Sequence, residues 1–305
     1  MRDRWRAWFD TSGWRLTIIG VPALWLVVLF LLPFLIVLSM SLAYRTMTAP
    51  PYGFGADFPF INLENYARLF QDSLYVRALL VSLGNAALAT VFCLMLGYPM
   101  ALGLTRVSRS WRTVLLMLVI LPFWTSFLLR VYAWMGLMGS QSWFNRLLTE
   151  AWNLLVPVDW ALRSVPLMYS NVAVILVFVY TYLPFMVLPL YTSLERLDPM
   201  LDEAATDLGA RPWKVFRDIT LPLSAPGIIA GGLLVFIPAS GELIIPTLVG
   251  DASDPMIGRV ISDEFSQARD WPMASAVSVA LLILLVGPMM LYSRYESRAA
   301  GEDES

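Results

Sequence analysis

Histidine is absent from this 305-residue sequence, and cysteine and lysine each occur once. Without histidine the chain has no Ser-His-Asp triad, no Cys-His dyad and no histidine-based metal site. Cys93 alone makes neither an internal disulfide nor a cysteine-rich metal site. Lys214 follows Trp213 instead of a glycine, so the GxxxxGK[ST] phosphate-binding loop is missing. We therefore assign no catalytic residue and no metal site, and we expect no ATP binding of the Walker type in this chain.

Charge is also scarce. Only 14% of the residues are charged, whereas soluble domains typically carry about 25%. Hydrophobic residues make up 58% of the chain, and the mean hydropathy is +0.66. This composition excludes a disordered chain and a collagen-like repeat, and it predicts an integral membrane protein.

Long apolar stretches organise the chain. Each is long enough to cross the roughly 30 Å hydrocarbon core as a helix, which takes about 20 residues. The stretches are continuous and do not alternate, which favours helices over a membrane barrel. We therefore predict an all-α integral membrane protein with six transmembrane helices. The predicted spans are residues 16–42, 78–105, 113–138, 166–194, 223–249 and 271–293.

The first span follows a basic segment that contains Arg2, Arg4, Arg6 and Arg15, as in a signal peptide. Its apolar run is much longer than the 7–15 residues of a signal peptide core, and no A-x-A cleavage site follows it. We expect an uncleaved first helix after a tail of residues 1–15.

Basic residues predict the orientation. Thirteen of the 21 basic residues lie in the two tails, in the loop at 106–112 and in the loop at 195–222. The positive-inside rule places these segments in the cytoplasm, including both termini and the tail at 294–305. The segments that face outward contain ten acidic residues and seven basic ones, a balance typical of ordinary solvated loops.

The loop at 195–222, which we call the elbow, contains strong local signals. Asp198 and Pro199 predict a helix start, Gly209 predicts a sharp stop, and Pro212 predicts a second short helix. A structured elbow on a membrane protein without an ATPase motif is typical of a docking surface. The alternative is a solvated connector whose helices cap themselves.

The elbow resembles the EAA loop of bacterial ABC importers. The residues that carry the resemblance are Glu203-Ala204-Ala205, Gly209 six residues after the glutamate, and Ile219-x-Leu221-Pro222. The resemblance implies a type I importer permease (MetI-like) fold and a coupling role for six residues. These are Glu203, Ala204, Ala205, Asp207, Gly209 and Lys214.

Further stretches resemble the PotB/PotH-type permeases of polyamine importers, most closely the PotH, putrescine-type branch. The matching segments span most of the chain and are residues 121–134, 183–189, 237–246, 256–259 and 269–272. The resemblance implies a non-catalytic subunit of the bacterial inner membrane. Its expected partners are a PotI-like second permease, two ATPases that bind ATP and Mg²⁺, and a periplasmic binding protein that delivers a polyamine. No cofactor is expected in this chain, and no nucleic acid partner.

Other functions stay open. The same architecture would suit another amine or an amino-acid cargo such as 4-aminobutyrate. A carrier that works without an ATPase is a second alternative. A membrane enzyme is disfavoured, because paired catalytic carboxylates are needed and only one acidic residue lies within a predicted span.

Two charges lie inside the predicted spans, Arg130 and Glu242. Charges inside a membrane are costly and therefore suggest function. Glu242 either pairs with Arg130 or faces the pore and receives an ammonium group, and Arg130 either takes part or extends to the outer interface. Aromatic side chains that could stack on a cation, or simply pack, complete the predicted substrate path. They are Trp124, Tyr132, Trp134, Tyr182 and Phe236.

Overall fold

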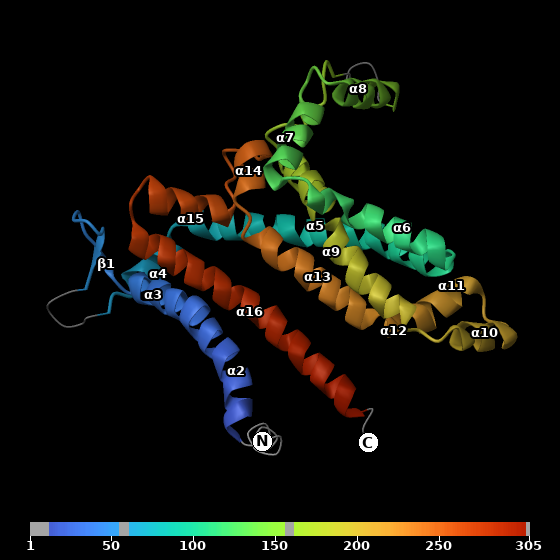
Figure 1. Ribbon diagram of the computed structural model, residues 1–305. Coiled ribbons are helices and arrows are strands. Elements are labelled where there is room, and N and C mark those ends of the chain that lie inside the picture. The colour runs from blue at the N-terminus through green and yellow to red at the C-terminus, as the bar shows by residue number, and fades with distance from the viewer. Residues whose placement is uncertain (1–11, 55–60, 156–161, 303–305) are drawn as a thin grey trace, which may run out of the picture. The chain divides into compact units, whose positions relative to one another are not determined.

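The computed structural model describes residues 12–54, 61–155 and 162–302. Within these ranges the chain is helical apart from its connections and one short hairpin (Figure 1). The hairpin pairs β1 (Tyr44–Arg45) with β2 (Tyr52–Gly53) in antiparallel register. Most of the predicted N-terminal tail lies outside the described residues. The chain divides into two compact units, Met1–Asp72 with Ile261–Ala280, and Ser73–Val260 with Leu281–Ser305.

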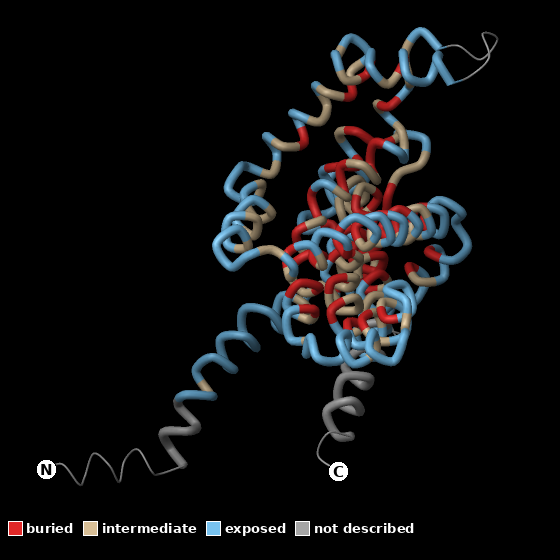
Figure 2. Tube along the Cα trace, turned by 90° about the vertical axis from the view of Figure 1, so that its right-hand side faces the viewer, coloured by how far each residue is buried: buried red, intermediate tan, exposed pale blue. Residues whose placement is uncertain are grey.

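The first unit begins with a long apolar helical segment. It contains α2 (Ser12–Leu26), the π-helical turn η1 (Val27–Leu31) and α3 (Leu32–Ser41), followed by the hairpin and α4 (Glu64–Gln71). Nearly all residues between Ile18 and Ile36 in this segment are exposed (Figure 2). Within the unit, the buried carboxylate of Asp270 lies 3.6 Å from Arg45 and 3.7 Å from Arg68. It also accepts a hydrogen bond from Met273 N, at the start of α16 (Trp271–Glu302).

Three helices form the core of the second unit: α5 (Ser73–Arg106), α9 (Asn171–Glu195) and α13 (Ala225–Ser240). Gly227 and Gly231 allow α13 to approach α9 closely. A Cβ atom on Gly227 would lie 2.5 Å from Ser193 Cβ, and one on Gly231 would lie 2.8 Å from Met186 Sδ. Such G-x-x-x-G pairs are common where membrane helices pack by their backbones. This motif was not among the features on which the sequence predictions rest.

Two predicted spans are interrupted. In the span predicted at 113–138, α6 (Arg109–Ile120) and the 3₁₀ turn η2 (Leu121–Trp124) meet α7 (Phe127–Met138) at an angle of 91°. The chain becomes extended at Thr125, after the turn that contains Pro122, and this interrupts the helix within the predicted span. In the span predicted at 223–249, α13 ends at Ser240 and α14 (Ile244–Val249) starts at Ile244, with three residues between them. Residues 241–243, which we call the break, separate them.

Several helices of the described chain are long and apolar enough to cross a membrane. By length and composition, three helices of the described chain are long enough to cross a membrane: Ile18–Ser41, Ser73–Arg106 and Asn171–Glu195. The count rises to five if each of two bent pairs forms one span: Arg109–Trp124 with Phe127–Met138, and Pro212–Leu223 with Ala225–Ser240. The apolar part of α16, Trp271–Gly287, is shorter. Six spans and cytoplasmic termini therefore stay predictions. The segment predicted as a C-terminal tail continues α16 as far as Glu302.

Candidate functional site

The first half of the elbow is a capped helix. Helix α10 (Pro199–Asp207) starts where the Asp198 side chain accepts a hydrogen bond of 2.9 Å from Met200 N, with Pro199 in the first helical position. A carboxylate at this position satisfies an otherwise unpaired backbone donor and interacts favourably with the positive end of the helix. The predicted helix start is therefore confirmed, and it follows from local sequence alone.

The turn of the elbow depends on Gly209. This residue has φ of +80°, in the left-handed region that glycine adopts without strain. Its N–H donates to Thr206 O at 2.9 Å, and Ala210 N–H donates to Ala205 O at 3.0 Å. These two bonds form a Schellman motif, which ends a helix and redirects the chain. The sharp stop predicted at Gly209 is confirmed.

The second half of the elbow returns to the core. Helix α11 (Pro212–Val215) continues through the π-helical turn η4 (Phe216–Thr220) into α12 (Leu221–Leu223). The Phe216 ring packs edge-on against Tyr98 of α5, with ring centroids 5.5 Å apart. Tyr98 in turn shares a buried hydrogen bond of 2.8 Å with Ser224. Tyr98 and Ser224 were not among the predicted site residues, because their contact joins positions 126 residues apart.

An ion pair supports the elbow at its other end. Arg112 Nη1 lies 2.8 Å from Glu195 Oε1, and Arg112 Nη2 donates to Thr105 O at 3.1 Å. The pair joins the first turn of α6 to the last residue of α9, and the bond to Thr105 O joins it to the end of α5. Both side chains are partly exposed, so the pair adds only about 0.2–1 kcal/mol. The ion pair matters mainly for position, because it fixes Glu195, the residue at which the elbow starts.

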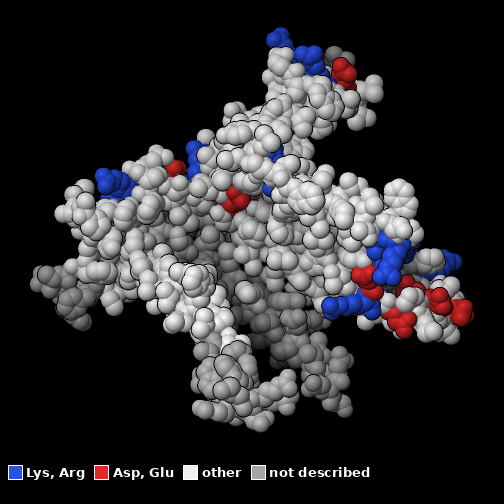
Figure 3. All heavy atoms as spheres, in the orientation of Figure 1, with Lys and Arg blue, Asp and Glu red and all other residues white. Residues whose placement is uncertain are grey.

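The outer surface of the elbow carries the predicted coupling residues. Glu203, Ala204, Asp207, Gly209 and Lys214 are exposed, and Ala205 is half-buried. A hollow of about 660 Å³ lies in the bend and is lined by Ala205, Leu208, Gly209, Ala210, Arg211, Trp213 and Lys214. Leu208 is 90% exposed and Trp213 70%. Figure 3 shows side chains of both charges gathered at α10 and α11. Large exposed apolar side chains beside a hollow are typical of a surface that binds another protein.

The second part of the candidate site is the break, residues 241–243, which contains Glu242. Gly241 follows the last residue of α13 as its C-cap, and Pro246 lies in the first turn of α14. Glu242 Oε1 accepts a hydrogen bond of 3.0 Å from Ile244 N, at the start of α14. Glu242 Oε2 accepts one of 2.6 Å from the Tyr182 hydroxyl of α9. The carboxylate is thus oriented by two uncharged donors, the N–H group at the start of α14 and the phenol of Tyr182.

Arg130 has different neighbours. Its guanidinium lies 5.5 Å from the ring centroid of Phe123 and 5.7 Å from that of Phe127, within cation–π range. Its Nε and Nη1 atoms are buried without a hydrogen-bond acceptor in the described chain. The ion pair between Arg130 and Glu242 that we considered is not formed among the described residues, since the bend in the α6–α7 segment gives the guanidinium aromatic neighbours instead.

Packed rings connect the two charged residues. Phe123 packs edge-on against Phe185, with centroids 5.0 Å apart, and Phe185 lies 6.2 Å from Tyr182. Arg130 thus contacts Phe123 at one end of this row of rings, and Glu242 accepts a hydrogen bond from Tyr182 at the other end. Phe123 and Phe185 were not among the predicted site residues. Arginine and glutamate give clear sequence signals inside apolar spans, whereas a phenylalanine there looks like any other core residue.

The remaining predicted path residues are less closely grouped. Tyr182 is buried, and Phe236 is half-buried against the core. Trp134 packs edge-on against Tyr180, with centroids 5.5 Å apart. Trp124 and Tyr132 are 80% and 54% exposed. The structure therefore brings Tyr182 to Glu242 and leaves Trp124 and Tyr132 on the surface of the chain.

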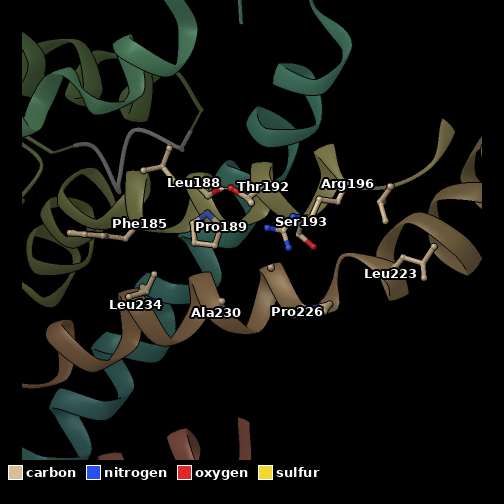
Figure 4. Close-up of a pocket in the computed structure, with 12 residues that line it drawn as sticks. Phe185, Leu188, Pro189, Thr192, Ser193, Arg196, Leu223, Pro226, Ala230 and Leu234 are labelled. Carbon is tan, nitrogen blue, oxygen red and sulfur yellow. Dashed lines mark hydrogen bonds between the residues drawn. The ribbon is translucent and has the colours of Figure 1, made fainter. Parts of the chain in front are cut away.

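A groove of about 630 Å³ runs between α9 and α13. Figure 4 shows Phe185, Thr192 and Ser193 of α9, and Arg196 directly after that helix, on the opposite side of the groove from residues of α13. Phe185 thus lies at both the groove and the row of rings. Among the described residues, no cluster of three or more His, Cys, Asp or Glu side chains could hold a metal ion.

Curated proteins of known name resemble this chain over most of its length. PotB, the spermidine/putrescine transport system permease protein of Haemophilus influenzae, is 40% identical over 272 residues, which cover 88% of this chain and 90% of that protein. PotB of Escherichia coli K12 is 40% identical over 282 residues, covering 91% and 94%. ModB, a molybdenum transport system permease protein of Mycobacterium bovis, is 31% identical and covers 70% of this chain and 76% of ModB.

Solved structures share the fold. A chain from the crystal structure of a bacterial alginate ABC transporter, in complex with an alginate pentasaccharide-bound periplasmic protein, superposes with a TM-score of 0.71 at 17% identity. The match covers 96% of this chain and 98% of that one. A chain of the MetNI methionine ABC transporter gives a TM-score of 0.51 at 18% identity, covering 73% and 94%. This chain therefore shares the fold of these ABC transporter chains.

A family model assigns the chain independently. The model of the binding-protein-dependent transport system inner membrane component matches residues 94–299, more than half of the sequence. The match includes the elbow, the break and Arg130 together. With the PotB relatives and the shared fold, it shows that this chain belongs to the family of binding-protein-dependent transport system inner membrane components, the ABC importer permeases, as a PotB-like member.

Proposed function

We propose that this chain is the membrane-spanning permease subunit of an ATP-driven importer that carries a polyamine into the bacterial cytoplasm. The observation that carries the proposal is the 40% identity to PotB over about nine-tenths of both chains. The relatives are named for both spermidine and putrescine, so the cargo class we propose is the polyamines. A preference for putrescine alone stays a prediction.

The elbow is the proposed contact with the ATPase. Its exposed small residues, Ala204 and Gly209, allow close approach, and Leu208 and Trp213 offer apolar area to bury. ATP and Mg²⁺ would bind to two partner ATPase subunits, in agreement with the missing phosphate-binding loop in this chain. A second, PotI-like permease would complete the pore, in a bacterial inner membrane.

The break is the proposed cargo contact. A polyamine that enters the pore loses water around its ammonium groups, and this loss is unfavourable without a counter-charge. Glu242 supplies a carboxylate whose two hydrogen-bond donors orient it. The neighbouring rings of Tyr182 and Phe185 offer cation–π faces worth about 0.5–2 kcal/mol each. A periplasmic binding protein would deliver the cargo to the outer segments.

Cargo is the part of this proposal that most needs a test. ModB shows that a permease named for molybdenum transport reaches 31% identity with this chain. The decisive sample is the whole importer, isolated with its own partner subunits through an affinity tag on this chain and placed in vesicles.

We expect ATP-dependent uptake of labelled putrescine or spermidine, blocked by excess unlabelled polyamine and unaffected by 4-aminobutyrate or molybdate. Uptake of 4-aminobutyrate with no uptake of polyamine would contradict the cargo. Transport that persists without any ATPase subunit would contradict the ATP-driven mechanism.

A further inference from the structure

The first turn of α15 (Ile257–Ser266) packs directly against the backbone of the break. A Cβ atom on Gly258 would lie 2.6 Å from the carbonyl oxygen of Glu242 and 2.7 Å from that of Gly241. Side chains do not tolerate such distances, so only glycine fits at position 258. Gly258 is also buried. The contact therefore joins α15 to Glu242, which carries the only carboxylate among the described break residues.

The start of α15 is fixed from its other side as well. Ile257 N–H donates to Ser82 Oγ of α5 at 2.7 Å, and both residues are fully buried. Asp254, just before the helix, pairs with Arg77 of α5 at 2.6 Å. The first turn of α15 is thus held between α5 and the break, and it has little room to move independently of them.

The chain between α14 and α15 is short and locally ordered. Asp251 Oδ1 accepts hydrogen bonds of 2.8 Å from both the N–H and the hydroxyl of Ser253. These bonds favour the charged carboxylate and hold the pKa of Asp251 below its ordinary value. A Cβ on Gly250 would lie 2.5 Å from Pro246 O, so this connection also begins in close contact with α14. The segment therefore links α15 to the break along the chain as well as through space.

From this geometry we infer that Gly258 is a positioning residue for Glu242. The α15 turn holds the carbonyl groups of Gly241 and Glu242, while Tyr182 and Ile244 hold the Glu242 carboxylate. A shift of α15 must therefore move the Glu242 backbone and change the alignment of its side chain. Because α15 lies in a segment predicted to face outward, binding of another protein at the outer surface would change the position of Glu242 by moving α15. The inference deepens the proposed function and rests on it.

Gly258→Ala is the direct perturbation, since it adds one methyl group at the point of contact. In an unhindered helix, alanine is more favourable than glycine. Here we expect the methyl group to displace the break, and the polyamine concentration for half-maximal uptake to rise about tenfold, since small misplacements of a binding group are costly. Gly84→Ala is the matched control, because a Cβ on this α5 glycine meets no atom within 4 Å.

A double-mutant cycle separates positioning from a general structural effect. The complete importer is compared as wild type, Gly258→Ala, Glu242→Gln and the double variant, with the cargo that the wild type transports. If Gly258 acts through Glu242, Gly258→Ala adds no further loss in the Glu242→Gln background. Equal losses in both backgrounds, or wild-type uptake by Gly258→Ala, would overturn the inference.

A second variant decides the matter if Gly258→Ala fails to assemble. Ser82→Ala removes only the hydroxyl that accepts from Ile257 N–H. We expect the polyamine concentration for half-maximal uptake to rise less than in Gly258→Ala, and not to rise further in the Glu242→Gln background. A Ser82→Ala effect that persists in the Glu242→Gln background would contradict the inference. Failure of the proposed function has a different signature, because wild-type vesicles would then take up no polyamine at all.

Discussion

The Tyr182 hydroxyl lies 2.6 Å from Glu242 Oε2, although the two residues are 60 positions apart in the chain. The bond joins the middle of α9 to the break between α13 and α14. A hydrogen bond from a neutral phenol orients a carboxylate without supplying a positive charge. Glu242 therefore keeps its ability to bind a cation, and the pairing with Arg130, which would have neutralised it, is not formed within the described chain.

Removing the Tyr182 hydroxyl tests whether this bond matters for transport. Tyr182→Phe leaves the ring contact with Phe185 and deletes only the donor to Glu242. A hydrogen bond to a charged group contributes about 1.5–3 kcal/mol, so we expect at least a tenfold rise in the half-maximal polyamine concentration. Uptake by vesicles that contain the whole importer is the measurement.

Tyr180→Phe is the control for this variant. Tyr180 lies on the same helix, and its ring packs against Trp134. We expect near-normal uptake from it. Equal losses from the two substitutions would show that the Tyr182 bond has no special role.

The Gly209 turn predicts a graded response to substitution. At φ of +80°, a β-branched valine is strained, whereas asparagine tolerates left-handed backbone best among the other residues. We expect Gly209→Val to keep the subunit in the membrane but to lose most cargo-stimulated ATP hydrolysis, and Gly209→Asn to retain much of it. Hydrolysis and uptake are measured on the same vesicles. Normal coupling in Gly209→Val would refute the docking role of the elbow.

Sidedness is tested by thiol labelling. Cys93 is fully buried in α5, so Cys93→Ser gives a cysteine-free background with little change in volume. Single cysteines are then placed at Asp202 in the elbow and at Ala252, both exposed. An impermeant thiol reagent added to intact spheroplasts should label position 252 and spare position 202. The reverse pattern would invert the predicted topology.

The elbow was predictable because its signals are local. Asp198, Pro199 and Gly209 each act within a few residues, so the helix, its cap and its turn follow from sequence. Proline by itself was less informative. Pro184 lies inside the continuous helix α9, whereas Pro122 precedes a 91° bend. Neighbouring helices decide whether the backbone groups freed by a proline are satisfied in place, and the sequence does not show those neighbours.

The cargo site was predictable only in part. Glu242 and Arg130 were identifiable because a charge in an apolar span is rare, but their partners depend on contacts between distant segments. Tyr182 reaches Glu242 across 60 positions, and Ser82 reaches Ile257 across 175. The close approach at Gly258 likewise depends on the position of the break, which the continuous apolar pattern of 223–249 did not predict.

The measurement that tests the central claim most directly is polyamine uptake by vesicles that contain the whole importer with Glu242→Gln. Glutamine keeps the shape of the side chain and can still accept from Tyr182, but it removes the negative charge. The account predicts normal assembly, normal basal ATP hydrolysis and at least a tenfold loss of putrescine and spermidine uptake at low concentration. Wild-type uptake by a stable Glu242→Gln importer would contradict the account and place the cargo contacts outside this carboxylate.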